Sequence, residues 1–248
     1  MMGTWPVIGT IAKRELAAYF ESPVAYVFLV VFLLLAGFFT FSLGGFFELG
    51  EASLSSFFTW MPWLFLFLVP AVGMRLWSEE RRLGTIELLL TMPVTTWQAI
   101  IAKFIASWAF LALALALTFP VVITVNLLGD PDNCVIIAGY VGSLLLAGTF
   151  LSIACLTSAL TRNQVIAFIL ALMICLLLIL VGFAPVTTML SRFADIWVVD
   201  TIASFSVLTH IEGFQKGVLD TRDLLFFFSV MAFSLFTTGV VLRSHRAG

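Results

Sequence analysis

Long stretches without a charged residue alternate along this chain with short charged segments. Each of these apolar stretches holds 19 or more residues, and a helix that rises about 1.5 Å per residue needs about 20 residues to cross the hydrocarbon core of a bilayer. The pattern therefore predicts an all-α integral membrane protein built as one transmembrane domain, residues 1–248. The six predicted spans are approximately residues 24–47, 54–76, 103–127, 134–160, 164–186 and 224–242.

Composition agrees with a membrane protein. Of the 248 residues 62% are hydrophobic and 10% are charged, whereas about 25% of the residues of a soluble domain are charged. The net charge of −2 argues against a nucleic-acid partner, because such partners require clustered Lys and Arg. Cys134, Cys155 and Cys175 show no CxxC spacing, and we expect them to be buried apolar residues.

The distribution of Lys and Arg predicts the orientation of the spans, because these residues concentrate on the cytoplasmic side of bacterial membrane proteins. With the N-terminus inside, nine of them lie inside and three outside. We therefore expect a multi-pass protein of the bacterial inner membrane with both termini in the cytoplasm. The inside set is Lys13, Arg14, Arg75, Arg81, Arg82, Lys103, Arg162, Arg243 and Arg246, and the outside set is Arg192, Lys216 and Arg222.

The middles of the predicted spans contain essentially no ionisable residues. Proton pumps, ion-coupled carriers and intramembrane hydrolases keep such residues there despite a cost of at least about 2.5 kcal/mol. His210 has no second ligand nearby in the sequence, so no metal site is predicted. No GxxxxGK[ST] loop is present, so a nucleotide is not bound in that way. We expect neither a catalytic residue nor a cofactor on this chain.

Small residues recur every four positions in the fourth predicted span, at Gly139, Ser143 and Ala147. This spacing lets two helices approach closely. It predicts a helix contact either within the chain or between two copies.

The N-terminal segment 5–20 has the pattern of an amphipathic helix. Trp5, Ile8, Ala12, Leu16 and Phe20 fall at three- and four-residue spacing. Lys13 and Arg14 lie off this stripe, where they can meet anionic lipid head groups. We predict a helix that lies in the inner interface of the membrane.

The charged loop between the second and third spans predicts a short helix, at about residues 79–93. Thr85 can cap a helix, and Glu87 then lies in a first turn that favours carboxylates. Pro93 ends the helix because it disfavours helical geometry at residue 92. The apolar stretch 88–102 contains this proline and is too short for a seventh span.

This loop carries a family resemblance. The sequence Glu79-Glu80-Arg81-Arg82-x-Gly84-Thr85-x-Glu87-x-Leu89-Leu90-x-x-Pro93-Val94, with Lys103 at the start of the next span, resembles the signature of ABC-transporter type-2 permeases. The segment 12–16 resembles the opening of that family, and the resemblance covers essentially the whole chain. The segment 208–223 is most similar to the gliding-motility-type permeases, and permeases for nitrous-oxide-reductase maturation are a near second.

The resemblance implies that the short helix is a coupling helix of an exporter, docked on a separate cytoplasmic ATPase that holds ATP and Mg²⁺. It also implies a complex of two ATPase chains with a second permease chain, which we expect to be the same, as a homodimer in the lipid bilayer. A second, smaller ATPase contact is expected at the turn after the fourth span. The implied contact residues are Glu79, Glu80, Arg81, Arg82, Gly84, Thr85 and Glu87, backed by Leu89, Leu90 and Pro93, together with Arg162 and Asn163.

The predicted outer segment, about residues 183–223, mixes apolar stretches with charges. It suits short helices that cap the bundle, and the resemblance places them near an exit gate. An alternative function remains open from the sequence, in which the chain passes ATP-driven motion to a periplasmic partner without moving a solute. The residues assigned to this gate or partner segment are His210, Phe214, Gly217, Asp220, Arg222 and Asp223.

Overall fold

The computed structural model describes residues 4–46, 53–84, 95–192 and 195–244, and the regular secondary structure in these ranges is helical. The elements are α1 (Thr4–Glu21), α2 (Pro23–Phe38), a π-helical turn η1 (Phe39–Leu43), α4 (Ser55–Gly73), α5 (Arg75–Leu83), α7 (Thr96–Ala116), α8 (Phe119–Leu128), α9 (Asn133–Leu160), α10 (Gln164–Leu180), α11 (Ala184–Leu190), α12 (Ile196–Ala203), α13 (Val207–Gln215) and α14 (Thr221–Ser244).

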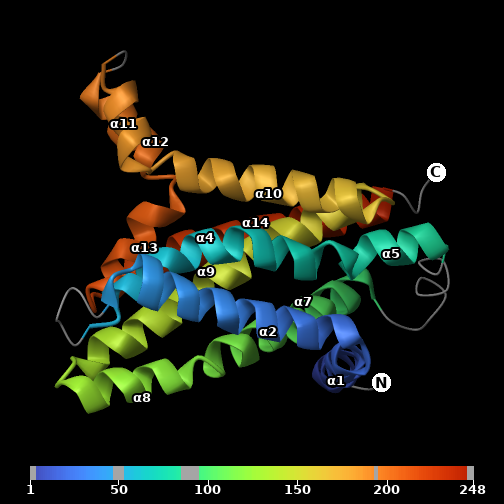
Figure 1. The fold of residues 1–248 in the computed structure, drawn as a ribbon. Coiled ribbons are helices and arrows are strands. Elements are labelled where there is room, and N and C mark those ends of the chain that lie inside the picture. The colour runs from blue at the N-terminus through green and yellow to red at the C-terminus, as the bar shows by residue number, and fades with distance from the viewer. Residues whose placement is uncertain (1–3, 47–52, 85–94, 193–194, 245–248) are drawn as a thin grey trace.

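The long helices run side by side (Figure 1). We call the end that holds α1, α5 and the last turn of α14 the inner end, and the end that holds α8 and α13 the outer end. Five helical stretches are long and apolar enough to cross a membrane: Pro23–Leu43, Ser55–Leu83, Thr96–Leu128, Asn133–Leu160 and Thr221–Ser244. The bent pair α10–α11 makes a sixth if it counts as one span.

The fifth predicted span, 164–186, is not one straight helix. Helix α10 ends at Leu180, and α11 turns away from it by 68°. Pro185 lies in the first turn of α11. It has no N–H to continue the hydrogen-bond ladder and its ring clashes with the carbonyl one turn earlier, so α10 cannot run through it.

The third span begins earlier than residue 103. Helix α7 starts at Thr96, where a capping box joins Thr95 to Gln98. Lys103 therefore lies about two turns inside the helix, and it does not open the span as the sequence suggested. The apolar stretch 88–102 thus contributes its second half to α7.

Helix α9 is the centre of the bundle, and α4, α5, α7, α10, α13 and α14 pack around it. Ser143 and Ala147 are fully buried within the chain. A Cβ added at Gly139 would stand 2.5 Å from the ring of Phe58. The small-residue stripe is therefore used within the chain, and it is not a seam between two copies. Cys155 and Cys175 are buried as expected, whereas Cys134 is exposed.

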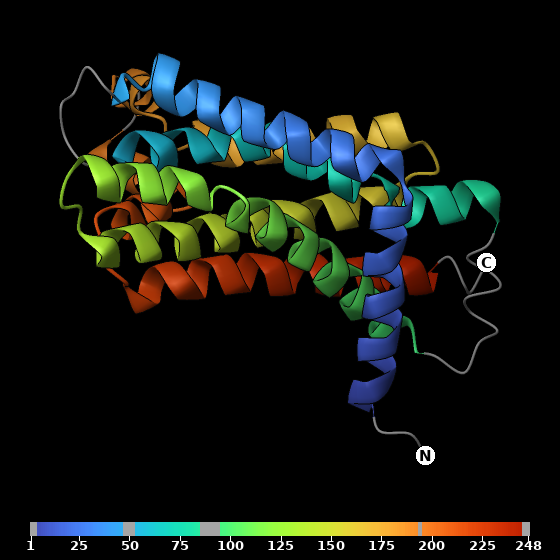
Figure 2. The ribbon, with the colours of Figure 1, turned by 60° about the horizontal axis from the view of Figure 1, so that its bottom comes forward.

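Helix α1 crosses the inner end of the bundle at a steep angle to α2 (Figure 2). The sharp turn is made at Ser22, whose Oγ accepts from the N–H of Val24, and at Pro23 in the first turn of α2. One face of α1 packs on α7, where the ring of Tyr19 stacks on Phe110 at 5.0 Å. A helix is thus present where the apolar stripe predicts one.

Candidate functional site

Helix α5 continues the second span beyond the apolar core. Together α4 and α5 form a helical stretch of 29 residues, Ser55–Leu83. The helix ends at Gly84, whose φ of +73° is left-handed and suits glycine. The short helix expected at about 79–93 therefore does not begin at residue 79. Residues 79–83 instead form the end of α5, which begins at Arg75. Thr85, Glu87, Leu89, Leu90 and Pro93 lie outside the described residues.

Hydrogen bonds attach α5 to the inner end of α9. The backbone N–H groups of Trp77 and Ser78 both donate to the Ser158 Oγ, at 3.0 Å. That hydroxyl donates in turn to the carbonyl of Met74, at 2.8 Å. The Arg81 guanidinium donates to the carbonyl of Ala159. Since several bonds join the two helices along one side, we expect α5 and this end of α9 to move together.

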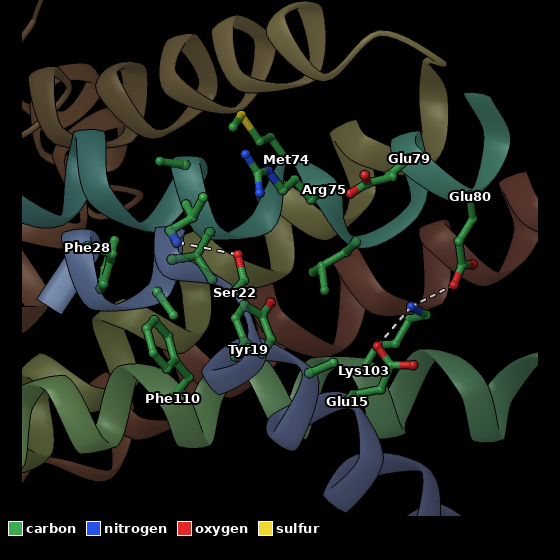
Figure 3. Close-up of a pocket in the computed structure, with 16 residues that line it drawn as sticks. Glu15, Tyr19, Ser22, Phe28, Met74, Arg75, Glu79, Glu80, Lys103 and Phe110 are labelled. Carbon is green, nitrogen blue, oxygen red and sulfur yellow. Dashed lines mark hydrogen bonds and ion pairs between the residues drawn. The ribbon is translucent and has the colours of Figure 1, made fainter. Parts of the chain in front are cut away.

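A buried ion-pair cluster joins α5 to α7 and α1. The Lys103 Nζ lies 2.8 Å from the Glu80 carboxylate and 3.2 Å from the Glu15 carboxylate (Figure 3). The side chain of Lys103 is only 7% exposed, and its ammonium also lies 5.5 Å from the centre of the Trp77 ring. Buried charges are stable only when paired. Lys103, Glu15 and Glu80, which we call the inner triad, therefore hold three helices together.

Tyr19 supports the inner triad from α1. Its hydroxyl lies 2.8 Å from the Ser107 Oγ, one turn along α7 from Lys103. Burial raises the pKa of this phenol. A neutral tyrosine with its hydroxyl bonded is compatible with the apolar contact between α1 and α7.

The turn between α9 and α10 lies beside α5. Its backbone is fixed by Thr161, whose Oγ1 accepts from the Asn163 N–H, and by Asn163, which caps α10 through the N–H of Val165. Helix α10, which begins at this turn, contacts α5. The two predicted ATPase contacts, in α5 and in this turn, are thus neighbours in space. We call the exposed residues Arg82, Gly84, Arg162 and Asn163 the inner surface.

The predicted coupling residues separate into different environments. Glu80 points inward to Lys103, and Glu79 lines a cavity between α5 and α1. The sequence pattern did not predict that Glu15 pairs with Lys103 or that Lys103 is buried. One signal was available for Lys103, since a single lysine amid apolar residues is costly unless it is paired.

The outer residues are built into the packing of α13 and α14. His210 Nδ1 lies 2.7 Å from an Asp223 oxygen, and the ring stacks on Phe226 at 4.0 Å. Phe214 is fully buried, and a Cβ at Gly142 of α9 would stand 2.6 Å from the Cβ of Phe214.

Two further outer residues shape the turn before α14. Gly217 has a left-handed φ of +78°. The Asp220 side chain accepts from the N–H of Arg222 at the start of α14, at 3.0 Å, and the side chain of Arg222 is exposed. Part of the outer set therefore packs inside the fold, whereas Gly217, Asp220 and Arg222 are exposed.

Comparison with known proteins agrees with this architecture. No curated protein matches the chain significantly. The family described as ABC-2 family transporter protein matches residues 47–216, which is more than half of the chain and includes both α5 and the turn at Arg162. The chain therefore belongs to the ABC-2 transporter family, as a multi-pass membrane permease component.

Proposed function

We propose that this chain is the permease subunit of an exporter in the bacterial inner membrane, driven by a separate cytoplasmic ABC ATPase that docks on the inner surface. The family implies an ABC ATPase as partner. The excess of Lys and Arg at the inner end supports a cytoplasmic location for this end and for both termini. Two ATPase chains and a second copy of the permease complete the proposed complex, and residues 208–223 favour a gliding-motility-type permease.

The single observation that supports this proposal most is the way α5 is attached. Its exposed tip carries Arg82 and Gly84, its side is bonded to α9, and Glu80 connects it to α7 and α1 through Lys103. A partner that displaces the tip of α5 therefore displaces the inner ends of several helices together. In this proposal Glu80 passes motion inward, whereas Arg82 and Arg162 meet the ATPase.

Charge reversal on the inner surface tests the docking site. Arg82→Glu and Arg162→Glu change exposed side chains, so we expect insertion and folding to be retained while co-purification of the cognate ATPase and stimulation of its activity are strongly reduced. Lys216→Glu, on an exposed lysine at the other end of the molecule, is the matched control. Normal ATPase binding and stimulation by the Arg82→Glu/Arg162→Glu double variant would refute docking at this surface.

A second function, transmission of motion to a periplasmic partner, is favoured by α11 and α12. These helices project away from the bundle (Figure 1) and carry large exposed apolar side chains, among them Met189 and Trp197. Moreover, the buried hydroxyls of α9 at Ser143, Thr149 and Ser152 bond to carbonyls of their own helix. They therefore need no solute to satisfy them.

Replacing both exposed side chains by serine separates the two functions. If the chain transmits motion through α11 and α12, Met189→Ser/Trp197→Ser releases a periplasmic protein from the purified complex and leaves ATPase stimulation intact. If the same change converts a dimeric permease into a monomer, the projection is a contact between copies and the transmission function is rejected.

A further inference from the structure

A cavity of about 530 Å³ lies between α1, α2, the last turn of α4, α5 and α7 (Figure 3). One part of its wall is apolar and is formed by Ala25, Phe28, Val72 and Phe110. The other part is charged and is formed by the inner triad together with Arg75 and Glu79 of α5. A cavity of this size with apolar and charged walls suits part of an amphiphile.

The depth of the cavity follows from the length of the second span. Arg75 lies 20 residues after Ser55, where the helical stretch begins. At 1.5 Å per residue this is about 30 Å, the thickness of the hydrocarbon core. A span that enters the hydrocarbon at Ser55 therefore leaves it near Arg75, close to the level of the lipid phosphates, and Glu79 follows one helical turn nearer the water.

The charges on the wall are not all paired within the described residues: Arg75 is exposed and Glu79 is half-buried. Lys103 is occupied by Glu15 and Glu80. By contrast, neither Arg75 nor Glu79 forms an ion pair with another of the described residues. Although they are four positions apart on one helix, no ion pair joins the Arg75 guanidinium to the Glu79 carboxylate (Figure 3). The cavity thus presents one cation and one anion, separately, beside an apolar wall.

We propose that this cavity binds a phospholipid of the inner leaflet whose head group carries both a phosphate and a primary ammonium, as in phosphatidylethanolamine. Arg75 binds the phosphate and Glu79 binds the ammonium, while the first carbons of an acyl chain lie along Phe28 and Val72. A head group with only negative charge is disfavoured, because it brings no cation to Glu79, which lines the cavity. This inference goes beyond the proposed function and does not depend on ATPase docking.

Native mass spectrometry of the full chain, released from nanodiscs with equal amounts of phosphatidylethanolamine and phosphatidylglycerol, tests the proposal. We expect retained adducts to be mainly phosphatidylethanolamine. Because a hydrogen bond to a charged group contributes about 1.5–3 kcal/mol, Arg75→Gln and Glu79→Gln should each weaken this retention about tenfold or more. Glu79→Gln should also remove the preference over phosphatidylglycerol, since it removes the ammonium partner.

Two further variants keep the test independent of folding. Ala18→Trp fills the mouth of the cavity from an exposed position on α1, so it should reduce retention without unfolding the chain. Glu212→Gln removes an exposed carboxylate from α13 at the outer end and should change nothing. Equal retention of both lipids by the wild type, or unchanged retention in Glu79→Gln and Ala18→Trp, would overturn the proposal. Stronger retention of phosphatidylglycerol would assign the cavity to an anionic lipid and would equally overturn it.

Discussion

The inner and outer ends of this permease are each closed by a partly buried polar contact, but the two contacts join different parts of the chain. At the outer end His210 meets Asp223, which is only 13 positions away, and the pair closes a local turn between α13 and α14. At the inner end Lys103 meets Glu15, 88 positions away, and also Glu80. The inner contact joins three helices that are distant in sequence, so it can pass a displacement through the bundle. The outer contact joins only α13 and the start of α14, where these two helices meet.

Removing Lys103 should have the largest effect. Lys103→Met removes the cation that Glu15 and Glu80 share, and breaking a buried ion pair in this way costs about 3–5 kcal/mol. We expect a large decrease in the thermal stability of the purified chain in detergent, together with loss of ATPase stimulation. The neutral triple variant Lys103→Met/Glu15→Gln/Glu80→Gln should recover much of the stability without recovering stimulation. Recovery of both would show that the triad is structural only.

A smaller loss of stability is expected where α4 approaches α9, next to α5. A Cβ added at Gly73 would stand 2.4 Å from the Cβ of Ala154, so Gly73→Ala forces two buried helices apart at a cost of about 1–3 kcal/mol. Nothing lies within 4 Å of a Cβ added at Gly37 of α2, and Gly37→Ala is the matched control. Chemical denaturation of both variants measures the difference. Equal stability of the two variants would contradict the tight joint between α4 and α9.

The outer contact should affect stability without affecting coupling. Asp223→Asn weakens its bond to His210 and should cost about 1.5 kcal/mol. We expect a modest decrease in melting temperature and unchanged ATPase stimulation, in contrast to Lys103→Met. If Asp223→Asn abolishes stimulation while the fold persists, the outer corner also takes part in coupling and the contrast between the two ends fails.

Substitutions on the inner surface should have the smallest effect on the stability of the chain. Arg82→Ala and Arg162→Ala change exposed side chains and should alter the free energy of unfolding by less than about 0.5 kcal/mol. Stimulation of the ATPase should nevertheless decrease, and more in the double variant than in either single one. Unfolding measurements and ATPase assays on the same preparations separate these two effects.

The spans and the position of the inner surface could be predicted from sequence, because both depend on local composition. Charge-free length identified the membrane helices. The charge-dense loop predicted a helix at about 79–93, whereas α5 covers Arg75–Leu83. Helix α10 ends at Leu180, six residues before the predicted end of the fifth span at 186, because the charge-free stretch continues past this point and its length alone does not show the break near Pro185. The inner triad was missed for a different reason. Glu15, Glu80 and Lys103 lie on three helices, and only the packing of α1 and α5 against α7 brings their charges together.

Photo-crosslinking in the assembled complex tests directly whether the ABC ATPase docks at the inner end of the permease. A photoreactive amino acid is placed at Leu83 at the tip of α5, which is 63% exposed, or at Leu219 before α14, which is 59% exposed. We predict that irradiation joins the chain to the ABC ATPase from Leu83 and not from Leu219. ATPase adducts from Leu219, or none from Leu83 in a complex with active stimulation, would contradict docking at the inner surface.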